Sequence, residues 1–274
     1  MSSYLSQFNY QFYGPEDGRR WVFLHGLMGY GFNWRRIATG LQDSERVLLY
    51  DQRGHGKSWK PLTGYSPEDY ADDLFLITQE LGWDRFILVG HSMGGRNALC
   101  FADRFPEKIE KLVIEDIGPE SDPAAPEYFR WLLGLVPTPF VNKLSAKEFF
   151  MNQFKPLVRG KVENVDTLGA YLYSNIIENQ DGTADWRFSR EAVMASVIQG
   201  RAQDRWQELK ALSMPTLVIR GQTSKELPLP IFQQMLQANS RIEGVEIPNA
   251  GHWVHSDQPE EFLKVIRKFT GLTI

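Results

Sequence analysis

The sequence predicts an α/β fold in which a mostly parallel central sheet is flanked by helices on both faces. Short, continuous apolar runs alternate along the chain with amphipathic helical segments, and strands of this kind are buried on both faces. Between residues 119 and 212 the apolar strand-like runs stop, and only helical stretches rich in aromatic residues occur. The sequence therefore predicts one α/β core, residues 1–118 and 213–274, with a helical cap at 119–212.

The core elements follow in order along the chain. An alternating segment at 8–13 predicts an antiparallel edge hairpin that leads into the sheet. The expected core strands are residues 21–24, 47–50, 86–89, 112–114, 216–219 and 245–247. The expected core helices are residues 33–41, 67–81 with Ser66 as N-cap, 94–104, 229–236 and 259–269. Because sites in open parallel sheets form beyond the carboxyl ends of the strands, functional residues are expected directly after each apolar run.

The cap segment predicts helices but no strand. The expected cap helices are residues 127–135, 146–154, 165–177 and 190–198. Four prolines interrupt the first part of this segment: Pro123, Pro126, Pro137 and Pro139.

Composition excludes several classes of partner. The net charge of −4 gives no basic field for nucleic acid or an anionic membrane. The single cysteine, Cys100, excludes an internal disulfide and suits a reducing compartment. Residues 1–13 lack the pattern of a signal peptide, and no apolar run is long enough to span a bilayer. We expect a cytoplasmic protein, a monomer or small homo-oligomer, that acts on a small molecule.

The segment from Gly90 to Gly94 carries the strongest chemical signal. It reads Gly-His-Ser-Met-Gly and lies between the strand at 86–89 and the helix at 94–104. A G-x-S-x-G sequence at a strand-to-helix turn holds its serine in a strained backbone conformation, with the hydroxyl exposed beyond the sheet. The pattern predicts Ser92 as a nucleophile.

A serine nucleophile needs a base, and His252 is the best placed of the histidines. It follows the last predicted strand and precedes the final helix, so it lies at the same edge of the sheet as Ser92. Four other histidines have different expected places: His25 and His55 in loops after the first two strands, His91 turned away beside Ser92, and His255 outside the immediate site.

Two backbone N–H groups are expected to stabilise an oxyanion. Met93 follows the nucleophile directly and supplies one of them. Leu27 supplies the other from the glycine-rich bend at 25–29, which follows the first core strand.

Taken together, these motifs resemble the α/β-hydrolase superfamily along almost the whole chain. The matching segments are His25-Gly26, residues 51–58 with the sequence DQRGHGKS, the turn around Ser92, and Gly251-His252. The resemblance implies a serine–histidine–acid triad, and it implies that residues 51–58 form a tight loop without a catalytic role.

The acid of the triad is displaced from its usual position. In most members of the superfamily it lies three residues beyond the glycine that here is Gly221, and that position holds Ser224. A minority of members place the acid after the strand that here is 112–114, where Glu115 and Asp116 follow. We predict Asp116 as the acid, with Glu226 as the second choice, and expect replacement of Ser224 by alanine to have little effect.

This shift narrows the resemblance to YbfF-like and ABHD11-like serine esterases. It depends on the acid position, on Asp116-Ile117-Gly118-Pro119, and on Trp186-Arg187-Phe188 late in the cap. The resemblance implies a carboxylesterase or thioesterase that acts on short to medium acyl chains. No group of histidines, cysteines and carboxylates has the spacing of metal ligands, so no metal and no cofactor are expected. The expected substrate-binding residues are Met28, Phe140, Phe150, Leu172 and Trp253.

Two alternatives stay open. Carbon–carbon bond hydrolases also use a serine and often carry a tryptophan after the histidine, as Trp253 does here. Arg96 could then bind a substrate carboxylate, although pairing with an acidic neighbour is favoured. The fold also serves as a small-molecule-binding module with little turnover, and the absence of an acid at position 224 keeps this alternative open.

Overall fold

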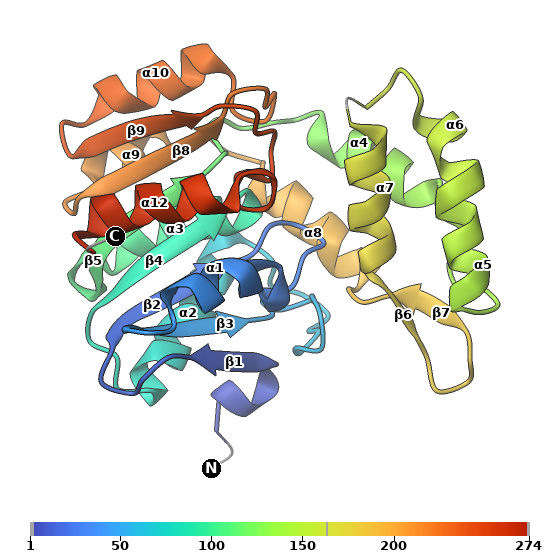
Figure 1. The fold of residues 1–274 in the computed structure, drawn as a ribbon, viewed down its shortest axis with the longest axis horizontal. Helices are drawn as coiled ribbons and strands as arrows, with labels where there is room; N and C mark the ends of the chain where they lie inside the picture. The colour runs from blue at the N-terminus through green and yellow to red at the C-terminus, as the bar shows by residue number, and fades with distance from the viewer. Residues whose placement is uncertain (1–2, 163, 273–274) are drawn as a thin grey trace.

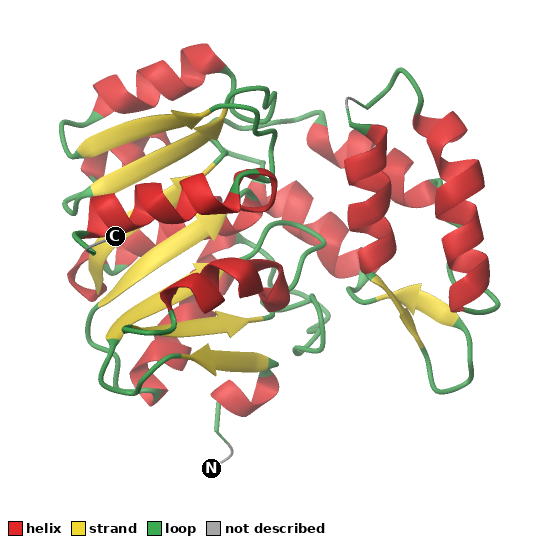
Figure 2. Cartoon of the chain, in the orientation of Figure 1, coloured by secondary structure: helices red, strands yellow, loops and turns green. Residues whose placement is uncertain are grey.

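A computed structural model describes residues 3–162 and 164–272 of the chain. Seven strands form its main sheet in the order β1-β3-β2-β4-β5-β8-β9 (Figures 1 and 2). The strands are β1 Tyr10–Tyr13, β2 Arg19–Leu24, β3 Glu45–Tyr50, β4 Phe86–His91, β5 Ile109–Glu115, β8 Thr216–Gly221 and β9 Ile242–Ile247. Neighbouring strands are parallel except for β1, which pairs antiparallel with β3. The predicted parallel sheet is confirmed. The edge strand is not part of a hairpin, because its partner is β3 and not the next strand.

Helices cover both faces of the sheet, which explains why the central strands are apolar throughout. One face packs on α2 Pro67–Glu80, α3 Met93–Arg104, α9 Trp206–Ala211 and α10 Leu229–Ala238. The other face packs on α1 Arg35–Leu41, α11 Val254–Asp257 and α12 Pro259–Thr270. Three short 3-10 helices complete the core: η1 Leu5–Gln7, η2 Gly31–Trp34 and η3 Pro106–Lys108. Ser66 is the N-cap of α2 and accepts a hydrogen bond from the backbone N–H of Asp69, as predicted.

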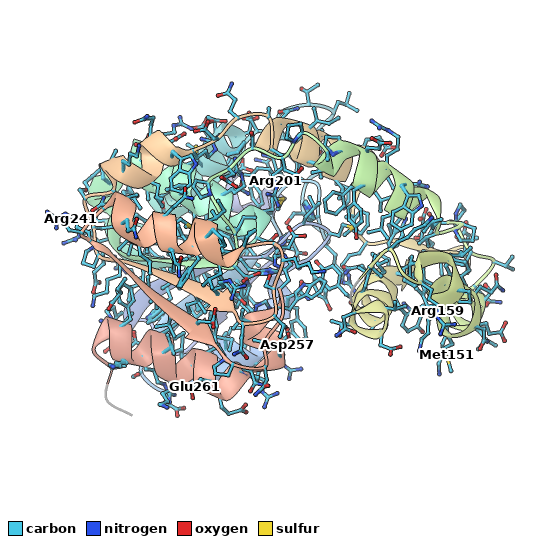
Figure 3. All side chains as sticks on the ribbon, turned by 90° about the horizontal axis from the view of Figure 1, so that it is seen from above. Met151, Arg159, Arg201, Arg241, Asp257 and Glu261 are labelled. Atoms are coloured by element: carbon cyan, nitrogen blue, oxygen red, sulfur yellow. The ribbon has the colours of Figure 1, made fainter. Side chains whose placement is uncertain are left out.

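The cap follows β5 and stands to one side of the core (Figure 1). Its helices are α4 Ala125–Gly134, α5 Lys143–Glu148, α6 Phe154–Val158, α7 Val165–Ser174 and α8 Arg190–Gly200, with a π turn, η4 Phe149–Gln153, joining α5 to α6. Met151 and Arg159 lie at the end of the cap far from the core, whereas Arg201 lies at the junction (Figure 3). Helix α9, which falls within the stretch that the sequence assigns to the cap, packs against α3 and α10.

The cap also contains a small antiparallel hairpin that the sequence analysis missed. Strands β6 Ile176–Glu178 and β7 Ala184–Trp186 pair with each other, so the helix predicted at 165–177 ends earlier, at Ser174. Each strand has only three residues, which is too short for an alternating pattern to register. None of the helices within residues 3–162 and 164–272 combines the length and the apolar character that crossing a membrane requires.

Candidate active site

Ser92 lies at the turn between β4 and α3 in a strained conformation, with φ 54° and ψ −119°. Glycine is required on both sides because the backbones approach closely. A Cβ at Gly90 would lie 2.3 Å from the carbonyl oxygen of Gly94, and a Cβ at Gly94 would lie 2.4 Å from that of Leu24. The Ser92 N–H donates to the carbonyl of Glu115 at 3.0 Å, which ties the turn to the neighbouring strand. The sequence motif therefore folds as a nucleophile elbow.

His252 and Asp116 meet at the carboxyl edge of the sheet. His252 Nδ1 lies 2.8 Å from Asp116 Oδ2, and the Asp116 carboxylate is fully buried. Burial lowers the pKa of the His252 imidazole, but the hydrogen bond and the negative charge of Asp116 outweigh it and hold this pKa above the usual histidine value. The pair can therefore orient the ring and stabilise its protonated form.

Two further donors fix the Asp116 carboxylate. The backbone N–H of Gly221 donates to Oδ1 at 2.9 Å, and the hydroxyl of Ser224 donates to Oδ2. The sequence analysis expected Ser224 to matter little, whereas the structure places its hydroxyl on the Asp116 carboxylate. Ser224 lies in the loop after β8, and its hydroxyl binds the same carboxylate oxygen as the histidine.

Glu226, the second choice for the acid, lies on the rim of the cavity instead of behind the histidine. Its side chain is 50% exposed, and its carboxylate is 3.5 Å from Arg201 Nη2. Within the described part of the chain it makes no hydrogen bond to His252. The geometry therefore favours Asp116.

Glu115 points to the opposite side of β5, as strand alternation predicts. It is fully buried and accepts hydrogen bonds from the N–H and from Nδ1 of His255. His91 Nε2 donates to the carbonyl of His252 at 2.9 Å, and burial holds the pKa of His91 well below the usual value. Across residues 3–162 and 164–272, this trio is the one group whose donor atoms lie close enough to hold a metal, within 4.8 Å of one another. Glu115 and His255 are hydrogen-bonded to each other, and His91 is hydrogen-bonded to the backbone of His252. These three buried residues therefore support the loop that carries His252.

The bend after β2 forms a tight turn beside Ser92. The Gly29 N–H donates to the carbonyl of Gly26 at 3.0 Å, and Met28 has φ 61°. The N–H groups of Leu27 and Met93 donate no hydrogen bond to any described residue, and both residues line the same cavity as Ser92 and His252. This is the arrangement that an oxyanion site requires.

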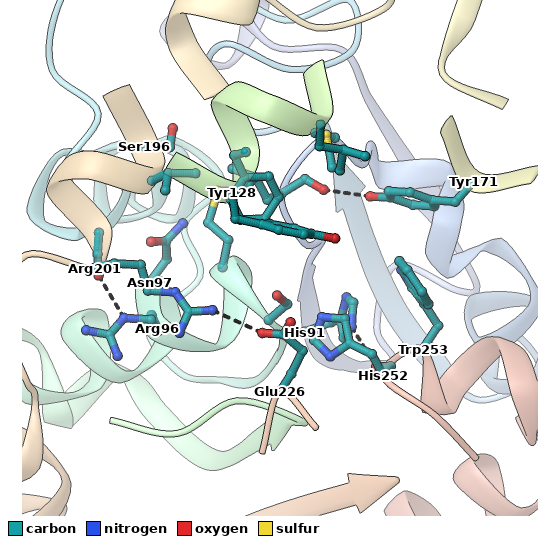
Figure 4. Close-up of a pocket in the computed structure, with 18 of the residues that line it drawn as sticks. His91, Arg96, Asn97, Tyr128, Tyr171, Ser196, Arg201, Glu226, His252 and Trp253 are labelled. Carbon is teal, nitrogen blue, oxygen red and sulfur yellow. Dashed lines mark hydrogen bonds and ion pairs between the residues drawn. The ribbon is translucent and has the colours of Figure 1, made fainter. Parts of the chain in front are cut away.

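The cavity lies between the core and the cap (Figure 4). Met28 and Trp253 line it, as expected, but Phe140, Phe150 and Leu172 do not. The prediction is wrong for these three residues, because their side chains pack into the interior of the cap. The cap residues that do line the cavity are Tyr128, Phe129, Leu132, Leu168, Tyr171, Ser196, Val197, Gly200 and Arg201. Helical periodicity indicated an apolar face at 127–135, but it could not tell whether a given side chain faces the cavity or the cap interior.

Arg96 has a structural role in place of the two that the sequence suggested. Its guanidinium donates to the carbonyls of Gly118 and Glu120, where the chain enters the cap, and of Gly200 and Gln203, where it leaves. Arg96 stands four residues after Ser92 on α3, so it clamps both connections of the cap to the nucleophile helix. With four of its five N–H groups occupied by carbonyls, it is poorly placed to bind a substrate carboxylate.

Comparisons with known proteins agree with this architecture. Residues 22–259 match the family model of the alpha/beta hydrolase fold. The chain is 28% identical to the sn-1-specific diacylglycerol lipase ABHD11 of Mus musculus, over 90% of this chain and 80% of that protein. It is also 28% identical to a 2-(acetamidomethylene)succinate hydrolase of Mesorhizobium japonicum, over 92% of this chain and 88% of that protein.

A solved structure of a marine microorganism esterase superposes with a TM-score of 0.80 at 27% identity, covering 96% of this chain and 99% of that one. The resemblance inferred from the motifs, to α/β-hydrolases and among them to ABHD11-like proteins, is confirmed.

Proposed function

The chain belongs to the α/β-hydrolase fold family, and we propose that it is a serine hydrolase that cleaves carboxylic esters of short to medium acyl chains through an acyl-enzyme. One observation carries the proposal. His252 is held by a buried carboxylate at 2.8 Å and opens into the same cavity as the strained Ser92. A hydroxyl at a nucleophile elbow and an acid-oriented imidazole are the groups that acyl transfer needs.

In the proposed reaction, Ser92 Oγ attacks the ester carbonyl carbon and His252 takes the hydroxyl proton. The N–H groups of Leu27 and Met93 stabilise the tetrahedral oxyanion. His252 then protonates the leaving alcohol, which departs and leaves an acyl-enzyme. Water attacks the acyl carbon with His252 as base, and the carboxylic acid is released with Ser92 restored.

Asp116 stabilises the imidazolium in both halves of the reaction. It does not itself take the proton. No hydrogen bond joins Ser92 Oγ to the His252 ring among the described residues, and such contacts often shorten only when substrate binds.

The apolar lining of the cavity supports an ester with an acyl chain as the substrate. Its cap side is formed largely by apolar and aromatic side chains, including Phe129, Leu132 and Leu168, which suit an acyl chain. The relatives named as lipase and esterase are consistent with this chemistry.

A second candidate is hydrolysis of a small substrate that bears a carboxylate, as the name of the Mesorhizobium japonicum relative indicates for that protein. Arg201 favours it, because its side chain reaches the cavity and its contact with Glu226 is long, at 3.5 Å. A carbon–carbon bond hydrolase would use the same three catalytic residues. Comparing neutral esters with carboxylate-bearing substrates distinguishes these candidates.

The test is a panel of p-nitrophenyl esters from acetyl to lauroyl, assayed with the wild-type protein and with Ser92→Ala. We expect turnover in the wild type with a maximum at short or medium chains, and loss of that turnover in the variant. Equal rates in the two proteins, or no turnover of any ester, would contradict the proposal, and the latter would favour a binding protein.

A further inference from the structure

A side chain from the cap reaches the turn that carries one of the proposed oxyanion donors. Tyr171, on α7, donates a hydrogen bond from its hydroxyl to the carbonyl of Leu27 at 2.7 Å (Figure 4). Burial raises the pKa of this hydroxyl, so it remains protonated and a donor throughout the neutral range.

The bonded carbonyl belongs to the central peptide of the turn, between Leu27 and Met28, which is the peptide whose orientation distinguishes turn types I and II. The turn runs from Gly26 to Gly29, is closed by the hydrogen bond between them, and has a positive φ only at Met28. This is the pattern of a type II turn, which differs from type I by rotation of the central peptide. The left-handed region is unfavourable for methionine, so this orientation of the Leu27 carbonyl needs outside support. Tyr171 supplies it.

The absence of a side chain at Gly29 leaves room for the Tyr171 hydroxyl. A Cβ at Gly29 would lie 3.1 Å from the Tyr171 hydroxyl and 2.7 Å from Asn33 Oδ1. The Tyr171 ring also packs against Trp253, with 5.0 Å between ring centroids, and Trp253 is adjacent to His252 in the chain. One residue of the cap therefore contacts both the oxyanion turn and the histidine loop.

We propose that Tyr171 is a positioning residue. When the cap is packed against the core, the Tyr171 hydroxyl holds the turn that carries one of the oxyanion donors. With the cap in place, the hydroxyl holds the Leu27–Met28 peptide in its flipped orientation. This fixes the turn, and with it the neighbouring Gly26–Leu27 peptide, whose N–H is the proposed oxyanion donor. When the cap lifts, the hydrogen bond breaks and the turn is released. The role in turnover depends on the proposed ester hydrolysis, whereas the effect on the turn does not.

The matched test compares Tyr171→Phe with Tyr173→Phe. Tyr173 lies on the same helix, but its ring packs on Phe150 within the cap, and its hydroxyl makes no hydrogen bond to any residue that the structure describes. For Tyr171→Phe we expect kcat about 10-fold lower at unchanged KM, which is less than the roughly 10²–10³-fold cost of removing an oxyanion donor outright. Affinity for an alkyl boronic acid, which forms a tetrahedral adduct with serine, falls by the same factor. Tyr173→Phe leaves both quantities unchanged.

Amide hydrogen exchange gives a readout that needs no turnover. We expect the peptide spanning residues 26–29 to exchange faster in Tyr171→Phe than in wild type or Tyr173→Phe. Unchanged exchange, or a raised KM with kcat and boronate affinity intact, would overturn the proposal. If wild-type protein shows no Ser92-dependent turnover, ester hydrolysis is the claim that fails, and the exchange rates still decide whether Tyr171 holds the turn.

Discussion

The two walls of the cavity are built on different principles. The side of the cavity that the core forms, here called the core wall, is built around loops at the carboxyl ends of the strands, with residues of α2 and α3 beside them. In the described chain, all non-glycine residues with a positive φ lie in these loops: Met28, Ser92, Asp116 and Asn249. The cap wall is made of regular helices, α4, α7 and α8, whose side chains face the cavity without backbone strain.

This difference indicates a division of labour. Strained backbone persists only where surrounding contacts fix it, and it gathers where reacting groups must be held in place. The core wall is therefore expected to set the rate of the chemistry, whereas the cap wall selects the substrate. Arg96 and Tyr171 are among the contacts that join the two walls.

The largest expected effect comes from the core wall. Asp116→Asn keeps the shape of the side chain but removes the charge that orients and stabilises the His252 ring, so kcat should fall by about 10⁴-fold. Glu226→Gln, on the rim, should change kcat by less than about 3-fold, since exposed charges contribute little. Steady-state kinetics on the best p-nitrophenyl ester measures both, and the reverse order would move the acid to Glu226.

Breaking the connection between the walls should lower stability. Arg96→Met leaves partly buried carbonyls at both cap connections without this donor, so the free energy of unfolding should fall by about 1–3 kcal/mol. Arg201→Met, which removes only a long and partly exposed ion pair, should cost less than about 1 kcal/mol. Urea denaturation of the two variants tests this, and equal stabilities would show that Arg96 is no clamp.

Ser224→Ala tests the support of the acid. The variant removes one of the three hydrogen bonds to the Asp116 carboxylate, and hydrogen bonds to charged groups contribute about 1.5–3 kcal/mol. We expect kcat to fall by about 10–100-fold with little change in KM. A rate equal to that of wild type would restore the original expectation that position 224 is inert.

The pH profile should show the influence of Asp116 on His252. His252 acts as base only when neutral, so kcat/KM should rise with pH through an apparent pKa above the usual histidine value. In Asp116→Asn the charge that raises the pKa of His252 is gone while burial still lowers it, so this limb should move to lower pH. A limb that stays in place would mean that another group titrates.

The smallest effect separates the two sides of the cap helices. Phe150→Leu alters the cap interior and should leave the acyl-chain preference unchanged while costing about 1 kcal/mol of stability. Leu132→Phe, at the cavity, should shift the preference toward shorter chains. The ester panel distinguishes them, and a shifted preference in Phe150→Leu would return that residue to the binding site.

The sequence was most informative for the core wall. Strands buried on both faces predicted the parallel sheet, and Ser92, His252 and Asp116 follow strand ends, where topology brings them together. The role of Ser224 was missed because a serine in a loop does not reveal from the sequence that its hydroxyl binds the carboxylate of Asp116, which follows the neighbouring strand. In the cap, Phe140, Phe150 and Leu172 were misplaced because apolar periodicity marks a buried face without saying what covers it.

The most direct test of the central claim is to identify the residue that carries the acyl group. Wild-type protein is quenched in acid during turnover of p-nitrophenyl butyrate, digested and analysed by mass spectrometry, with Ser92→Ala as control. We predict a single butyryl adduct on the peptide that contains Ser92, absent from the control. An adduct on another residue such as Cys100, or an equal adduct in Ser92→Ala, would contradict the account.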